Sequence, residues 1–100
     1  MTSQNEWCVC GDVVKTDIRK RSVIVTVKGK IFRPKVFGVN GIIECVMTKE
    51  LYKAMHTRKD IEFTGHMILG KESRLIVEKI KTKKGVVLEV TESYKGVINV

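Results

Sequence analysis

The side chains best suited to bind a ligand are basic ones gathered in one stretch of the sequence. Residues 15–35 contain eight of the nineteen lysines and arginines and one acid, Asp17. Ammonium and guanidinium groups contact phosphates, and such contacts give salt-dependent affinity for a nucleic acid with little sequence information. The alternative is a solvated face without a ligand. The eight residues are Lys15, Arg19, Lys20, Arg21, Lys28, Lys30, Arg33 and Lys35.

Aromatic residues interrupt this basic stretch and follow it. Single-stranded nucleic acids are held by bases stacked on rings as well as by charge. Phe32 and Phe37 bracket an arginine, a proline and a lysine, which is the alternation of ring and charge expected of a binding strand; one of the two is expected in the core. Trp7 and Tyr94 are further candidate platforms. Phe63 alternates with apolar residues, so we expect it in the core.

A second basic cluster lies later in the chain, at Lys79, Lys81, Lys83 and Lys84. Its four positive charges add to the attraction for a polyanion. The two clusters and the two phenylalanines together give the predicted nucleic-acid contacts. These are Arg19, Lys20, Arg21, Lys28, Lys30, Phe32, Arg33, Lys35, Phe37, Lys81, Lys83 and Lys84.

Cysteine and histidine are the other residues with distinctive chemistry. Cys8 and Cys10 stand closer together than the pairs of a zinc knuckle, and only Cys45, His56 and His66 are considered as further ligands. In a strand the first two share a face, so we interpret them as small buried thiols. Neither histidine has a sequence partner typical of a catalytic base, and no phosphate-binding loop pattern occurs. The sequence therefore predicts no metal, no cofactor, no small-molecule substrate and no enzyme activity.

Length and composition limit the class of protein. One hundred residues predict a single domain over 1–100, with a core over about 7–80. A content of 43% hydrophobic and 30% charged residues is typical of a globular chain, and the net charge of +8 favours a polyanionic partner. Charged residues interrupt every apolar run, so we expect no membrane contact. The start lacks the pattern of a secretory signal and three cysteines cannot all pair, which predicts a cytoplasmic location.

The elements that must carry these side chains are mainly strands, because apolar residues recur with a period of two and Val, Ile and Thr are abundant. Val23, Val25 and Val27 are expected on one face of the second strand. Asn40-Gly41 is typical of a turn, and Pro34 of an edge or loop. The predicted strands cover residues 7–15, 23–28, 42–47, 60–69 and 74–80, with one or two more in 86–90 and 97–100.

One segment departs from the strand pattern. Thr48 is a suitable cap for a helix in which Leu51 and Met55 form an apolar i, i+4 pair, so we predict a short helix over 48–56. Three strands, a short helix and two strands are the order of the OB-fold, a five-stranded Greek-key barrel. An SH3-like barrel does not require this helix, and a ferredoxin-like domain needs two substantial helices. Residues 86–100 are predicted to add a C-terminal hairpin.

Three segments resemble the second half of bacterial single-stranded DNA-binding proteins and the related primosomal replication proteins. They are Lys49–Met55, Arg58–Met67 and Arg74–Ile80. Those families also place a short helix before a strand that ends in glycine, then a turn and a strand of the form apolar-x-apolar-Glu-x-Ile. The resemblance covers about a third of the chain strictly. It implies an OB-fold and a role in binding single-stranded DNA during DNA replication.

Charge, rings and element order together favour a non-catalytic, homodimeric OB-fold protein that binds single-stranded nucleic acid, DNA in preference to RNA. The alternative is a structural or protein-interaction β-barrel that assembles through its C-terminal strands, residues 86–100, and whose basic face is only solvated.

Overall fold

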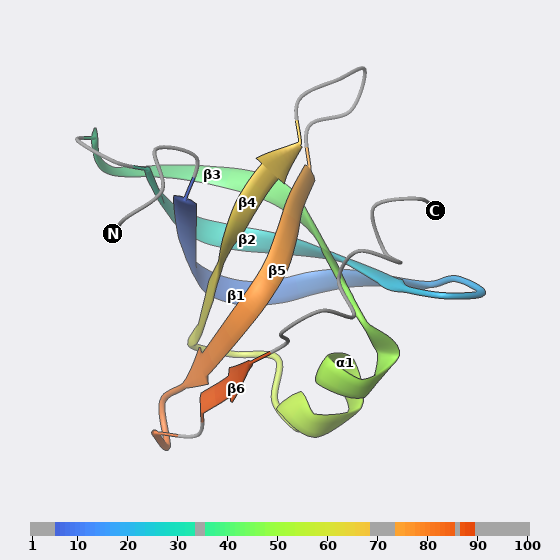
Figure 1. Cartoon of the computed structure of the whole chain (residues 1–100). Helices are drawn as coiled ribbons and strands as arrows, with labels where there is room; N and C mark the ends of the chain where they lie inside the picture. Colours follow the sequence, from blue (N-terminus) through green and yellow to red (C-terminus); the bar gives the residue numbers. More distant parts are fainter. Residues whose placement is uncertain (1–5, 34–35, 69–73, 86, 90–100) are drawn as a thin grey trace.

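Strands dominate the computed structural model of the chain (Figure 1). The structure describes residues 6–33, 36–68, 74–85 and 87–89. The strands are β1 (Glu6–Ile18), β2 (Val23–Arg33), β3 (Val36–Met47), β4 (Ile61–Ile68), β5 (Arg74–Thr82) and β6 (Val87–Glu89), and the helix α1 spans Lys49–Met55. The predicted strand at 97–100 lies outside the described residues.

The first five strands close into a barrel. Their hydrogen-bonded order is β3-β2-β1-β4-β5, with antiparallel neighbours throughout. β3 and β5 then pair in parallel, with Cys45 opposite Leu75, and this pairing joins the two ends of the sheet. Figure 1 shows β4 and β5 crossing in front of β1, β2 and β3, with α1 below them. A five-stranded closed barrel with a helix between β3 and β4 confirms the predicted OB-like fold.

The C-terminal extension begins with β6, which pairs in antiparallel fashion with the end of β5, Val87 opposite Lys81. This confirms the predicted strand within 86–90, and the rest of the predicted hairpin lies outside the described residues. One edge of β5 therefore serves two partners, β3 near its start and β6 near its end.

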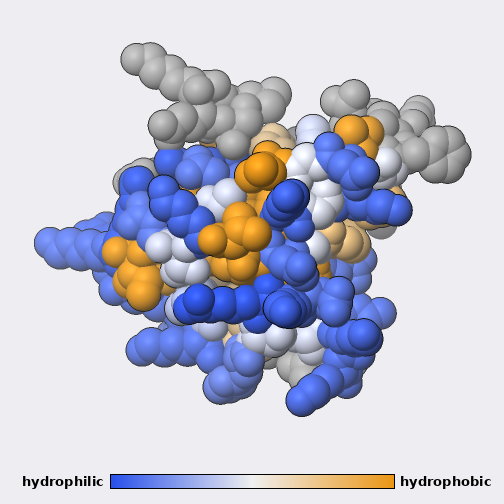
Figure 2. All heavy atoms as spheres, turned by 180° about the vertical axis from the view of Figure 1, so that it is seen from behind, coloured by the Kyte–Doolittle hydropathy of each residue, from blue (hydrophilic) through white to orange (hydrophobic). Residues whose placement is uncertain are grey.

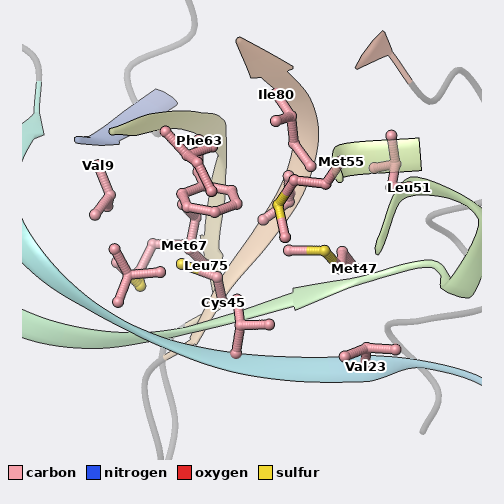
Figure 3. Packing of buried hydrophobic residues seen from close by; sticks show 14 residues of the cluster. Val9, Val23, Cys45, Met47, Leu51, Met55, Phe63, Met67, Leu75 and Ile80 are labelled. Atoms are coloured by element: carbon pink, nitrogen blue, oxygen red, sulfur yellow. The ribbon is translucent and has the colours of Figure 1, made fainter. Parts of the chain in front are cut away.

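Alternate residues of each strand fill the barrel interior. Val23, Val25 and Val27 are at most 1% exposed, as their spacing predicts. Phe63 of β4 is fully buried, which confirms its predicted place in the core. Figure 3 shows its ring in the middle of the interior, with Met55 and Leu51 reaching in from α1. Burying side chains of this size stabilises the fold by about 1.5–3 kcal/mol each.

The helix forms as its end signals predict. The Thr48 hydroxyl accepts a hydrogen bond from the backbone N–H of Leu51 at 3.2 Å, which satisfies one of the unpaired donors of the first turn. Leu51 and Met55 are buried on one face. The helix ends at His56, whose backbone is left-handed (φ 53°). No helix within the described residues is long and apolar enough to cross a membrane.

β2 and β3 form a longer ribbon than we predicted, and the expected turn at Asn40-Gly41 is wrong. β3 begins at Val36, and the two turn-type residues lie inside it, opposite Lys30 and Gly29 of β2. Continuous backbone pairing along β2 outweighs the local preference of Asn-Gly for a hairpin turn. The glycines allow close backbone approach, because a Cβ on Gly29 would lie 2.1 Å from the carbonyl oxygen of Cys10.

Candidate nucleic-acid interface

The outer face of β2 carries two lysines and a phenylalanine in alternate positions. Lys28, Lys30 and Phe32 point away from the barrel, because the residues between and before them turn inward. Both lysines are exposed. The next strand places Asp12 opposite Lys28 and Cys10 opposite Lys30. This face therefore offers two ammonium groups and one ring in a row, with a carboxylate beside the first.

The ring of Phe32 occupies the space that a side chain at Gly38 of β3 would need. A Cβ on Gly38 would come within 2.5 Å of the Phe32 ring, so the ring lies over this glycine of β3. The residue is only partly buried, and it is not part of the core cluster. Trp7, by contrast, packs against the core from β1. The side chain of Phe37 and the whole of Tyr94 lie outside the described residues.

The predicted basic stretch is divided into two places. Arg19, Lys20 and Arg21 form the exposed tip of the β1–β2 hairpin, which extends away from the barrel (Figure 1). Arg21 stands seven positions before Lys28, a separation of about 23 Å along an extended strand. Arg19 also pairs with Asp17, Nε to Oδ2 at 3.1 Å. The Arg33 side chain and all of Lys35 lie outside the described residues.

The second basic cluster occupies the far side of the same outer surface. Successive pairings place Lys30, Cys10, Glu62 and Lys81 in one row across β2, β1, β4 and β5. Neighbouring strands are about 4.8 Å apart, so this row is about 14 Å long on a curved surface. Lys83 and Lys84 follow β5 and are exposed.

Acidic residues separate the two basic clusters. Asp12 of β1 and Glu62 of β4 lie between β2 and β5, and the Asp12 carboxylate accepts a hydrogen bond from the backbone N–H of Asp60 at 2.9 Å. Asp60 in turn lies 3.9 Å from the Lys83 ammonium group. The predicted contacts therefore do not form one continuous basic surface.

The view onto β1, β2 and β3 from behind the molecule is mixed in character. Figure 2 shows hydrophilic side chains over most of this face, with apolar ones between them. Exposed apolar residues of these strands include Val14, Val39 and Ile42, and Ile42 lies beside Lys28 with 64% of its surface exposed. Such single apolar residues also offer contact area to a base or to another protein.

Cys8 and Cys10 share a face of β1 as predicted, but that face is the outer one, and both thiols are half-buried rather than buried. Their Sγ atoms are 3.9 Å apart, and the Cys8 thiol donates to Glu62 Oε1 at 3.2 Å. Burial, followed by the hydrogen bond to Glu62, raises the pKa of Cys8, and burial raises the pKa of Cys10. Both thiols are thus protonated at neutral pH, when a thiol is a poor nucleophile.

The other candidate ligands do not join these thiols. Cys45 is fully buried in the core, on the opposite side of the sheet from the outward-facing pair. His66 pairs with Glu78 of β5, and His56 is exposed after the helix. The closeness of Glu62 to Cys10 is not apparent from the sequence, because it depends on the pairing of β1 with β4. The alternating pattern of β4 is the only sequence signal that places it on the outer face.

Comparison with known proteins adds no family to the fold and the side-chain geometry described above. No protein-family model matches the chain, and no curated protein is significantly similar to it.

Proposed function

We propose that the protein binds single-stranded nucleic acid, DNA in preference to RNA, without catalysing a reaction. The observation that supports this most directly is the outward alternation of Lys28, Lys30 and Phe32 along β2. Lysine ammonium groups pair with backbone phosphates, and a partly exposed ring offers a surface on which a base stacks. β2 belongs to the part of an OB-type barrel that holds oligonucleotides in proteins of this fold.

The bound strand is proposed to run along Lys28, Lys30 and Phe32 of β2, which span about 13 Å. The hairpin tip at Arg19–Arg21 is a separate contact, because Ile24, on the same face between the tip and Lys28, is only 4% exposed and packs against Val46 and Ile76. Site sizes of about 4–16 nucleotides are usual for one OB-fold. Crossing from β2 to β5 would bring phosphates over Asp12 and Glu62, which is unfavourable. Lys81, Lys83 and Lys84 are therefore secondary contacts in this proposal.

A homodimer is part of the proposal, and the edge of β3 supports it. Over residues 36–43, β3 pairs with β2 on one side and has no strand partner on the other among the described residues. Val39 and Ile42 of this segment are 60% and 64% exposed. An open edge with apolar side chains is a template for pairing with another chain. The same edge also suits the alternative function, a protein-interaction barrel.

Fluorescence anisotropy of labelled oligonucleotides tests the function. Single-stranded DNA is expected to bind more tightly than duplex DNA or single-stranded RNA of the same sequence, with affinity falling steeply as salt rises. No binding of any oligonucleotide at low salt would reject the proposal. Removing residues 86–100 tests the part of the chain through which the alternative function would assemble. If the shortened chain no longer self-associates but still binds single strands fully, these residues serve association alone.

A further inference from the structure

We propose that Cys8, Cys10 and Glu62 form a binding site for one thiophilic divalent metal ion, with Zn²⁺ as the fitting ion. The site lies on the outer face of the barrel, between β1 and β4. It adjoins the proposed nucleic-acid contacts, because Cys10 lies opposite Lys30 and Cys8 opposite Phe32. None of its three ligands is one of those contacts, so the proposal does not depend on them.

The strand pairing brings the three ligands together. Cys8 and Cys10 occupy alternate positions of β1 and so point outward side by side. Glu62 of β4 lies directly opposite Cys10. Two strands of a closed sheet hold all three residues, so the barrel itself fixes their relative positions.

The distances suit a tetrahedral ion. The three ligand atoms lie within 4.8 Å of one another. Zinc bound at about 2.3 Å to each of two sulfurs in tetrahedral geometry separates those sulfurs by about 3.8 Å. The Sγ atoms of Cys8 and Cys10 are 3.9 Å apart, and Glu62 Oε1 is 3.2 Å from the Cys8 sulfur. A small outward movement of the carboxylate therefore completes three of the four positions.

A disulfide suits this pair less well than a metal. Residues two apart in an extended strand have their Cα atoms about 6.7 Å apart, close to the upper limit for disulfides. A shared ion needs no such closure, because it bridges sulfurs at the separation already present.

The surroundings leave room for a fourth ligand and supply compensating charge. Cys10 and Glu62 line a surface hollow of about 460 Å³, together with Lys81 and Asp60. This hollow gives an ion access from solvent and space for a water ligand. Two thiolates, a carboxylate and Zn²⁺ carry a net charge of −1. Lys30 and Lys81 stand at the two ends of the same cross-strand row and offset that charge.

Titration of the reduced full-length chain with Co²⁺ and then Zn²⁺ tests the site. We expect one ion per chain and a thiolate-to-cobalt charge-transfer absorption, which Zn²⁺ abolishes. Cys8→Ser and Cys10→Ser each leave one thiolate, so each should lower this absorption to about half at saturating Co²⁺. Each should also weaken Zn²⁺ binding by about a hundredfold or more, since even loss of an outer partner costs about 10–100-fold. Glu62→Gln should weaken binding by at least about tenfold while the absorption persists.

Cys45→Ala is the matched control, because it removes the one thiol that faces the core. It should bind Co²⁺ and Zn²⁺ as the unmodified chain does, with circular dichroism confirming that each metal-free variant is folded. The two protonated thiols each release a proton, so the apparent Zn²⁺ affinity should rise about a hundredfold per pH unit below their pKa values. Absence of the charge-transfer absorption in the unmodified chain, or unchanged binding in Cys8→Ser, would overturn the proposal.

Discussion

Replacing Lys28 and Lys30 together by alanine should weaken single-stranded DNA binding and flatten its salt dependence. Each phosphate neutralised on a single strand contributes about 0.7 to the slope of log affinity against log salt concentration. Both lysines are exposed and point outward from β2, so losing two contacts should flatten the slope by about 1.4. Between about 50 and 200 mM salt, the ratio of unmodified to variant affinity then shrinks about sevenfold.

The assay is fluorescence anisotropy of a labelled oligothymidine at four or more salt concentrations. The control variant carries Lys53→Ala and Lys59→Ala, which remove the same charge from exposed positions on α1 and the loop after it. If only total charge matters, the two double variants will behave alike. We expect the control to keep the slope of the unmodified chain within error. An unchanged slope for the β2 variant, or an equal loss in the control, would refute the placement of the strand on β2.

Further substitutions at three positions test the ring, the close backbone contact and the helix cap. Phe32→Ala should weaken single-strand binding by about 5–150-fold, equivalent to about 1–3 kcal/mol of stacking, in the same anisotropy assay; an affinity equal to that of the unmodified chain contradicts the platform. Gly29→Ala should lower the free energy of unfolding in urea by about 1–3 kcal/mol, because its Cβ would collide with the Cys10 carbonyl; an unchanged midpoint contradicts this contact. Thr48→Ala should cost about 1 kcal/mol in thermal unfolding while Thr48→Ser keeps most of the stability, and equal losses would exclude the cap.

The fold was predictable where local pattern and burial agree. The alternation of Val23, Val25 and Val27 and the cap at Thr48 are local signals, and both are confirmed. The Asn40-Gly41 turn failed because pairing with β2 outweighs a local preference. A strand partner tens of residues away is not visible in a short window of sequence.

The candidate site was predictable in its parts but not in its arrangement. Sequence alone identified the outward lysines of β2 and the shared face of Cys8 and Cys10. It did not reveal that β1 and β4, with Asp12 and Glu62, stand between the two basic clusters. It also predicted both thiols to be buried, whereas the structure turns Val9 inward and leaves the two thiols half-buried on the outer face. Which face of β1 lies inward depends on its pairing with distant strands.

The central position of β1 has a consequence for synthesis of the protein. β1 can pair with β2 as soon as residue 33 has left the ribosome, yet its other edge joins β4, where Glu6 lies opposite His66. During the interval the nascent chain presents β1 with one open edge, and open edges recruit other chains. A pause in translation before β4 should therefore promote aggregation, whereas one after β5, when the barrel is able to close, should not.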